Sequence, residues 1–123
     1  MAKHISSGSI LIVDDEASFR EMLSALLTSQ GYSVAVAADG VEAMNAVQNS
    51  FFDLVLLDVK MPRVDGVEVL HFIKQQYVDT QAIMLTGVDD VRIAVECMNL
   101  GAFHYLTKPY SADELMALID RAL

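Results

Sequence analysis

The segment ILIVDD, at residues 10–15, closes a short apolar run with two acidic residues, and FDLVLLD, at residues 52–58, closes another with one. Nearly continuous apolar runs of this length are typical of strands buried on both faces of a parallel sheet. If the two strands are neighbours, Asp14, Asp15 and Asp58 share one crevice. Two like charges about 4 Å apart repel each other by roughly 4 kcal/mol at an effective dielectric of about 20. A divalent cation is the simplest partner that offsets this repulsion.

Length and composition indicate one globular domain. The chain has 123 residues, of which 54% are hydrophobic, and a formal charge of −9 that argues against direct nucleic acid binding by this domain. Its single cysteine, Cys97, excludes an internal disulfide, and its helical position favours a small buried or partner-facing residue. Apolar runs stay well below the roughly 18 residues that span a bilayer. We therefore expect a loose leader at residues 1–8, a single domain at residues 9–123 and a cytoplasmic location.

Strand-like and helix-like segments alternate along the chain. Strands are predicted at 9–13, 33–37, 54–57, 82–85 and 103–106, and helices at 17–30, 41–48, 67–76, 89–99 and 111–122. Ser111 and Glu114 predict a capping box at the last helix. Apolar residues at helical spacing predict the inward faces of three helices, which comprise Phe19, Met22, Leu23, Leu26 and Leu27, then Val91, Ala94, Val95 and Met98, then Leu115, Leu118 and Ile119.

Five strand–helix units predict an α/β fold with a five-stranded parallel sheet, right-handed crossovers and helices on both faces. The expected class is the flavodoxin-like, doubly wound (βα)5 fold with strand order 2-1-3-4-5. Ligands of such sheets bind beyond the carboxyl ends of the strands, where the strand order reverses. Here that point lies between the first and third strands, which are the strands that end in the three aspartates.

The fourth and fifth strands add two more polar groups to the same edge. The sequence LTG places Thr86 at the end of one strand, with Gly87 allowing close approach to a ligand, and YLTKP places Lys108 at the end of the other. Taken singly, these residues fit a helix cap, a turn or a solvated surface lysine. Together, carboxylates, a hydroxyl and an ammonium suit a magnesium ion and a phosphoryl group.

Four motifs, VDDE (13–16), LLDVKMPRVDG (56–66), LTG (85–87) and YLTKP (105–109), resemble the receiver domain of bacterial two-component response regulators. The resemblance extends from about Ser9 to Leu123. It implies that Asp58 is the phosphoacceptor. It also implies Mg²⁺ binding, with Mn²⁺ as an alternative, by Asp14, Asp15, Asp58 and the main-chain carbonyl of Lys60.

The resemblance assigns three further roles. Lys108 pairs with Asp58 and then with the phosphoryl group, Thr86 follows the phosphoryl oxygen, and Tyr105 reorients with Thr86 as the switch aromatic. Such a domain catalyses only its own phosphorylation and dephosphorylation, so we do not expect an enzyme that acts on other substrates. Lys60 and Val88, two residues after Asp58 and Thr86, are expected to slow hydrolysis of the phosphoryl group.

The expected partners are a sensor histidine kinase, a phosphotransfer protein or a small phosphodonor on the input side. On the output side they are a partner or a fused effector domain for transcription regulation, contacted through the face of the fourth helix, fifth strand and fifth helix. Neither a membrane nor direct nucleic acid contact is expected, and a phosphorylation-dependent homodimer is one option that the sequence leaves open.

Three other interpretations were weighed. An aspartyl-phosphate phosphohydrolase needs a second acid two residues after its nucleophile, where this chain has Lys60. A nucleotide- or flavin-binding domain needs a glycine-rich loop after the first strand, where this chain has DDEAS. A pseudo-receiver that binds partners without phosphorylation shares the fold and remains an alternative.

Overall fold

The computed structural model describes residues 8–61 and 64–123, with the side chain of Val88 left out. Within these residues, five parallel strands form one sheet in the order β2-β1-β3-β4-β5, which confirms the predicted topology. The strands are β1 (Ser9–Val13), β2 (Ser33–Ala37), β3 (Leu54–Asp58), β4 (Gln81–Thr86) and β5 (His104–Thr107).

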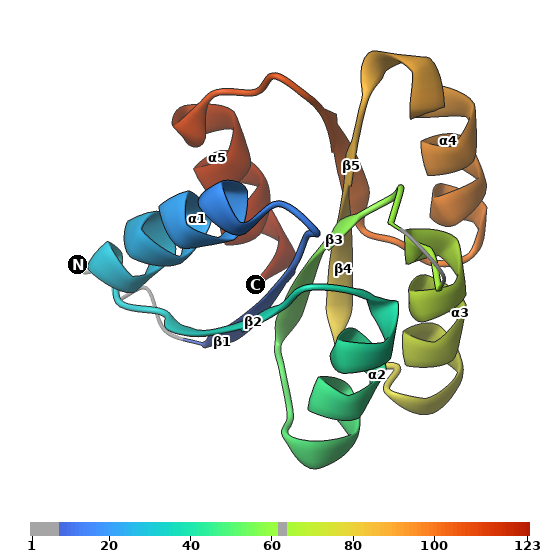
Figure 1. The fold of residues 1–123 in the computed structure, drawn as a ribbon, viewed down its shortest axis with the longest axis horizontal. Coiled ribbons are helices and arrows are strands. Elements are labelled where there is room, and N and C mark those ends of the chain that lie inside the picture. Colours follow the sequence, from blue (N-terminus) through green and yellow to red (C-terminus); the bar gives the residue numbers. More distant parts are fainter. Residues whose placement is uncertain (1–7, 62–63) are drawn as a thin grey trace.

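Helices cover both faces of this sheet, as Figure 1 shows. On one face lie α1 and α5, and on the other lie α2, α3 and α4. The helices are α1 (Ala17–Ser29), α2 (Gly40–Asn49), α3 (Gly66–Gln76), α4 (Val91–Asn99) and α5 (Ala112–Ala122), and a short 3₁₀ helix, η1 (Val88–Asp90), precedes α4. The expected flavodoxin-like class is therefore confirmed.

The central strands are apolar because each of their faces is covered. Ile10 and Ile12 pack toward α1 and α5, whereas Leu11 and Val13 join the cluster beneath α2 and α3. This alternation follows from the two-residue period of a strand. Each fully buried aliphatic side chain of this kind contributes roughly 1.5–3 kcal/mol to the free energy of unfolding. The strand ends are thereby held in fixed positions, which a chemical site needs.

Three helices begin with hydrogen bonds from a backbone N–H of their first turn to a polar side chain. Asp39 accepts the Glu42 N–H at the start of α2, and Asp65 accepts the Glu68 N–H at the start of α3. The capping box predicted for α5 is present, with Ser111 and Glu114 bonded reciprocally. Such caps satisfy backbone N–H groups that have no partner within the helix.

Several predicted details are wrong. Met22 and Val95 were placed on inward stripes but are 55% and 49% exposed. In α4 the buried residues are Ala94 and Cys97, so Val95, about 100° further round the helix, faces outward. The segment predicted as one helix at 89–99 is divided into η1 and α4. The three inward residues predicted for α5 are all buried.

At the amino-terminal end, the described residues begin at Gly8. Seven of the eight residues of the predicted leader lie outside the described residues, and the Gly8 carbonyl accepts the Ser33 N–H at 3.0 Å. Among the helices that the structure describes, none has the length and apolar character required to cross a membrane.

Candidate functional site

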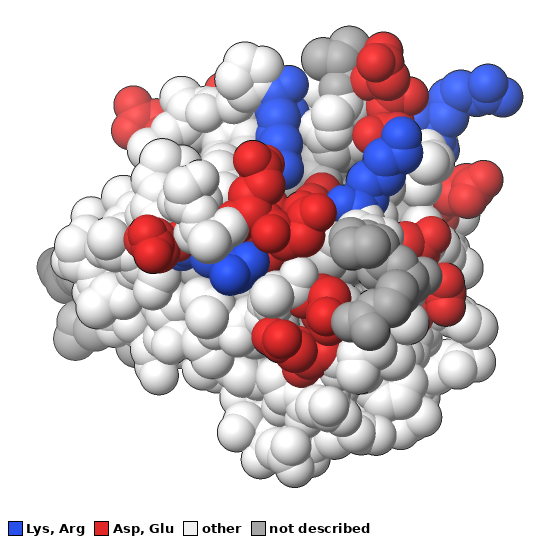
Figure 2. All heavy atoms as spheres, in the orientation of Figure 1, with Lys and Arg blue, Asp and Glu red and all other residues white. Residues whose placement is uncertain are grey.

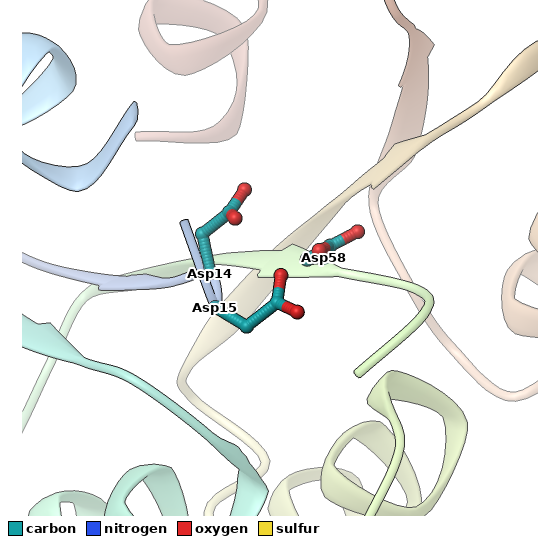
Figure 3. A group of neighbouring side chains, drawn as sticks. All are labelled: Asp14, Asp15 and Asp58. Carbon is teal, nitrogen blue, oxygen red and sulfur yellow. The ribbon is translucent and has the colours of Figure 1, made fainter. Parts of the chain in front are cut away.

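The three aspartates meet at the carboxyl edge of the sheet, beyond the ends of β1 and β3 (Figure 3). Asp58 is the last residue of β3, and Asp14 and Asp15 directly follow β1. One carboxylate oxygen from each residue lies within 4.8 Å of the others. Asp14 is fully buried and Asp58 is 8% exposed, whereas Asp15 is exposed. The fold therefore brings together the three acids that the sequence selected.

β3 and β4 each run one residue further than predicted, because the pairing between strands includes Asp58 and Thr86. Asp58 pairs in register with Leu85 of β4, and Thr86 pairs with Thr107 of β5, so both polar residues belong to the strands rather than to the loops after them. The prediction ended each strand one residue earlier; the low strand propensity of Asp accounts for the difference at Asp58 but not at Thr86, because Thr is enriched in strands. The ladder thus fixes the backbone of both residues.

Lys108 supplies the positive charge of this site. Its Nζ lies 3.3 Å from an Asp14 oxygen and 3.8 Å from an Asp58 oxygen, and it also stands 4.7 Å from the centre of the Phe19 ring. The Lys108 N–H donates to the Thr86 carbonyl at 2.7 Å, and the Lys108–Pro109 peptide bond is cis. One ammonium therefore faces two buried carboxylates, with Asp15 beside them.

The surroundings of Asp58 make its carboxyl group harder to ionise than a free one. Burial, aided by Asp14 and Asp15, raises the pKa of Asp58 to about 6 against the opposing effects of Lys108 and the backbone N–H of Lys60. A carboxylate with a raised pKa is one whose charge lacks full compensation. The group thus has the character of a cation ligand or a reactive group rather than of a structural salt bridge.

Glycine at position 66 lets α3 begin against the strand end. A Cβ there would collide with the Asp58 carbonyl and the Val59 backbone, and the Gly66 N–H donates to the Val59 carbonyl at 3.0 Å. The close approach holds the loop after β3 near the acids. It explains the glycine of the LLDVKMPRVDG motif by packing rather than by backbone conformation.

The two predicted switch residues lie on the neighbouring strands. Thr86 is fully buried and its hydroxyl donates to the Gly87 carbonyl at 3.2 Å. Tyr105 is half-buried against the core cluster beneath α3 and α4, and its N–H donates to the His104 ring at 2.8 Å. The rings of the neighbouring residues His104 and Tyr105 are in contact, with centroids 5.7 Å apart.

Sequence reasoning overlooked Tyr110, which directly follows the KP motif. Its hydroxyl is buried with no hydrogen-bond partner among the described residues, and its ring packs edge-on against Phe19. Burial raises its pKa, and the Asp14 and Asp58 carboxylates raise it further. Its place directly after the KP motif was the available signal in the sequence, whereas its contact with Phe19 of α1 is set by the fold.

The interpretation of Cys97 as a small core residue is confirmed. Cys97 is fully buried, and burial, aided by Glu96 and Asp65, raises its pKa to about 11. The reactive form of a cysteine is the thiolate. A buried thiol with this pKa is a packing residue.

Acidic side chains gather in the middle of the face shown in Figure 2, with basic side chains around them. Fold and site together define a class: a doubly wound α/β domain that holds an aspartate cluster and one lysine at the switch point of its parallel sheet. The donor set of three carboxylates is compatible with a hard metal cation.

Comparison with known proteins identifies the family. Residues 10–120 match the model of the response regulator receiver domain, and the chain belongs to that family. Phosphorylation on an aspartate and the use of Mg²⁺ are general features of this family, whose members work with histidine kinases and output effector domains.

Among its relatives, the chain is 38% identical to the transcriptional regulatory protein FixJ of Bradyrhizobium diazoefficiens, over 96% of this chain and 58% of FixJ. It is 44% identical to the response regulator MprA of Mycobacterium sp., over 88% of this chain and 47% of MprA. The chain thus spans about half the length of these curated relatives. The crystal structure of the receiver domain of NtrX from Brucella abortus superposes with a TM-score of 0.88 at 33% identity, over 93% of this chain and 97% of that one.

Proposed function

We propose that Asp58 of this receiver domain accepts a phosphoryl group from a sensor histidine kinase, a phosphotransfer protein or a small phosphodonor. The observation that carries the proposal is the convergence of Asp14, Asp15 and Asp58 on one point, with the Lys108 ammonium beside two of them. The same geometry suits a phosphoryl group, whose oxygens need positive charge on several sides.

The cation that fits this site is Mg²⁺, with Mn²⁺ as an alternative. Carboxylate oxygens are the preferred ligands of both ions, and Asp14, Asp15 and Asp58 with the main-chain carbonyl of Lys60 would hold it. Bound there, it supplies positive charge that keeps Asp58 ionised and screens the phosphoryl oxygens.

Asp58 acts as the nucleophile of the reaction. One of its carboxylate oxygens forms a bond to phosphorus as the bond from phosphorus to the donor breaks. The donor leaves as imidazole, which takes up a proton, or as acetate when acetyl phosphate is used. Lys108 is 3.8 Å from Asp58 and stabilises the negative charge on the transferred group. The product is an acyl phosphate that water hydrolyses, so the domain catalyses only its own phosphorylation and dephosphorylation.

Signal output follows from a change in hydrogen-bond partner at Thr86. Without a phosphoryl group on Asp58, the Thr86 hydroxyl donates to the Gly87 carbonyl. A phosphoryl oxygen on Asp58 is a stronger, charged acceptor, so Thr86 turns toward it and Tyr105 moves into the space that Thr86 leaves. The altered face of α4, β5 and α5 then binds an output partner, a fused effector domain or a second copy of the chain.

In this proposal the domain works in the cytoplasm without contacting nucleic acid or a membrane itself. The relatives FixJ and MprA are named as a transcriptional regulatory protein and a response regulator. By analogy with them, the output of this chain is regulation of transcription, exerted through another domain or a partner.

Intact mass measurement after incubation with acetyl phosphate tests the acceptor. We expect one phosphoryl adduct that requires Mg²⁺, that is absent from Asp58→Asn and that is retained in Asp53→Asn, a matched change just before the same strand. A phosphoryl adduct on the Asp58→Asn variant would show that a residue other than Asp58 is the acceptor. No adduct on the wild type would favour the pseudo-receiver, and repeated turnover of an added phosphoester would favour the phosphohydrolase.

A further inference from the structure

An ion pair joins the two loops that flank Asp58. The Lys60 ammonium lies 3.3 Å from a carboxylate oxygen of Asp90, which is mostly buried, while the Lys60 side chain is 73% exposed. Lys60 stands two residues after Asp58, and Asp90 stands four residues after Thr86. The phosphotransfer chemistry above uses neither of these two side chains, although their pairing ties the loop after β4 to the loop after β3.

Asp90 is the last residue of η1 and directly precedes α4, yet its side chain makes none of the capping contacts seen before α2, α3 and α5. The side chains at the starts of α2, α3 and α5 each accept a backbone N–H from the third residue of the helix, and their backbones are extended, with ψ of 177°, 174° and 156°. Asp90 has ψ of 14° and no side-chain cap bond.

Asp90 is instead held within η1. Its N–H donates to the Gly87 carbonyl at 3.0 Å, and a Cβ on Gly87 would lie 3.4 Å from its second carboxylate oxygen. Its carboxylate therefore lies back over the loop that follows Thr86 while it reaches Lys60. Aspartate is among the most favourable residues at a helix start, so this arrangement leaves an available cap unused.

The two interactions that compete for the Asp90 side chain are of similar strength in proteins generally. Exposed lysine–carboxylate pairs contribute little to stability, and a cap bond contributes a comparable amount. A small change at Lys60 is therefore enough to shift the balance between them. Phosphorylation of Asp58 is such a change, because it adds negative charge and three acceptor oxygens near a flexible lysine whose own backbone N–H already bonds the Asp58 carboxylate.

We propose that Lys60 and Asp90 form a latch that phosphorylation of Asp58 opens, an inference that rests on the proposed function. The Lys60 ammonium turns from Asp90 to the phosphoryl oxygens. Asp90, released, becomes extended and caps α4 through the Ile93 N–H, the third residue of the helix. Because η1 unwinds in this step, the backbone after Thr86 moves, and phosphorylation reaches the start of α4 by a route separate from Tyr105.

Backbone amide hydrogen exchange, read residue by residue by NMR on the full chain, tests the latch. Lys60→Met removes the pair in the unphosphorylated protein and leaves Asp90 free to cap. We expect the Ile93 amide to exchange at least about three-fold more slowly and the Asp90 amide about three-fold faster, since one hydrogen bond forms as the other is lost. Adding Asp90→Ala to Lys60→Met should abolish the slowing at Ile93, and Lys60→Arg, which keeps the charge, should behave as wild type.

The phosphorylated wild type should show the same two opposite changes. Exchange at both amides within two-fold of wild type in Lys60→Met would overturn the latch, and so would a wild type that carries the phosphoryl adduct without the two changes. Absence of the adduct by mass would contradict the proposed function instead, and the Lys60 variants would still decide whether the latch exists.

Discussion

The two ends of β3 each carry an aspartate, and the two residues have opposite surroundings. Asp53, just before the strand, accepts the Ser9 N–H at 2.9 Å, and its backbone bonds both Ser9 and Gln81. Asp58, at the other end, faces two further carboxylates and shares Lys108 with Asp14. One acid joins neighbouring strands through hydrogen bonds, whereas the other is crowded by like charge. The contrast separates an acid that stabilises the fold from the one that we propose accepts the phosphoryl group.

The largest expected effect is a gain in the free energy of unfolding when Asp58 is replaced by the neutral residue asparagine. The pKa of Asp58 is raised from 3.8 to about 6 in the metal-free protein, so the folded state holds this proton more tightly than the unfolded state does. Stability from this group is full below about pH 3.8 and is lost as the pH rises through about 6, by up to about 3 kcal/mol. Asp58→Asn should regain this amount at about pH 7.5 without divalent cations, and almost none at about pH 4.

Urea unfolding at the two pH values, with a chelator present, measures this difference. An Asp58→Asn protein that is no more stable than wild type at neutral pH would contradict the electrostatic account of the site. With Mg²⁺ added, the wild type should gain stability and the variant much less, because a ligand that binds only the folded state stabilises it.

The next effect concerns Lys108, the positively charged side chain of the site. Lys108→Met should lower the rate of phosphorylation by acetyl phosphate by roughly 10²-fold, since one preorganised charge at a transferred group contributes on this scale. Lys74→Met is the matched control, because Lys74 bonds the Val78 and Thr80 carbonyls far from the acids. Time courses of adduct formation by mass give the rates, and equal rates for Lys108→Met and wild type would remove Lys108 from the mechanism.

A smaller effect is expected at the opposite end of the strand. Asp53→Ala leaves the Ser9 N–H without its acceptor and should destabilise the fold by about 1–2 kcal/mol, with phosphorylation of Asp58 retained. Chemical denaturation and the mass assay together check both parts. A loss of phosphorylation in the folded Asp53 variant would show that the two ends of β3 are not independent.

The smallest predicted change is kinetic. The double variant Lys60→Asn, Val88→Glu should hydrolyse the phosphoryl group several-fold faster than wild type, because a basic and an apolar residue are replaced by polar residues that can orient an attacking water. Decay of the adduct after removal of the phosphodonor measures this rate. A decay no faster than that of the wild type would show that these positions do not set the lifetime here.

Most of the fold and the acidic cluster followed from the sequence. Apolar runs that end in Asp14 and Asp58 predict buried parallel strands, and the topological rule for such sheets brings their carboxyl ends together. Errors arose where the answer depended on neighbours distant in the chain. Met22 fits the apolar pattern of α1 but lies on the exposed side of that helix. Tyr110 belongs to no sequence motif, and its contact with Phe19 is evident only once α1 is placed beside it.

The sequence by itself determined the order of elements, the sheet and the identity of the acids at its edge, because these depend on periodicity and on a general rule of chain topology. Only the tertiary structure decided how each polar group is paired. Asp90 lies inside the helix predicted at 89–99, but in the fold its side chain pairs with Lys60, and Lys108 pairs with both Asp14 and Asp58. Pairing of this kind is set by distances of a few ångströms between separate loops, which local sequence does not encode.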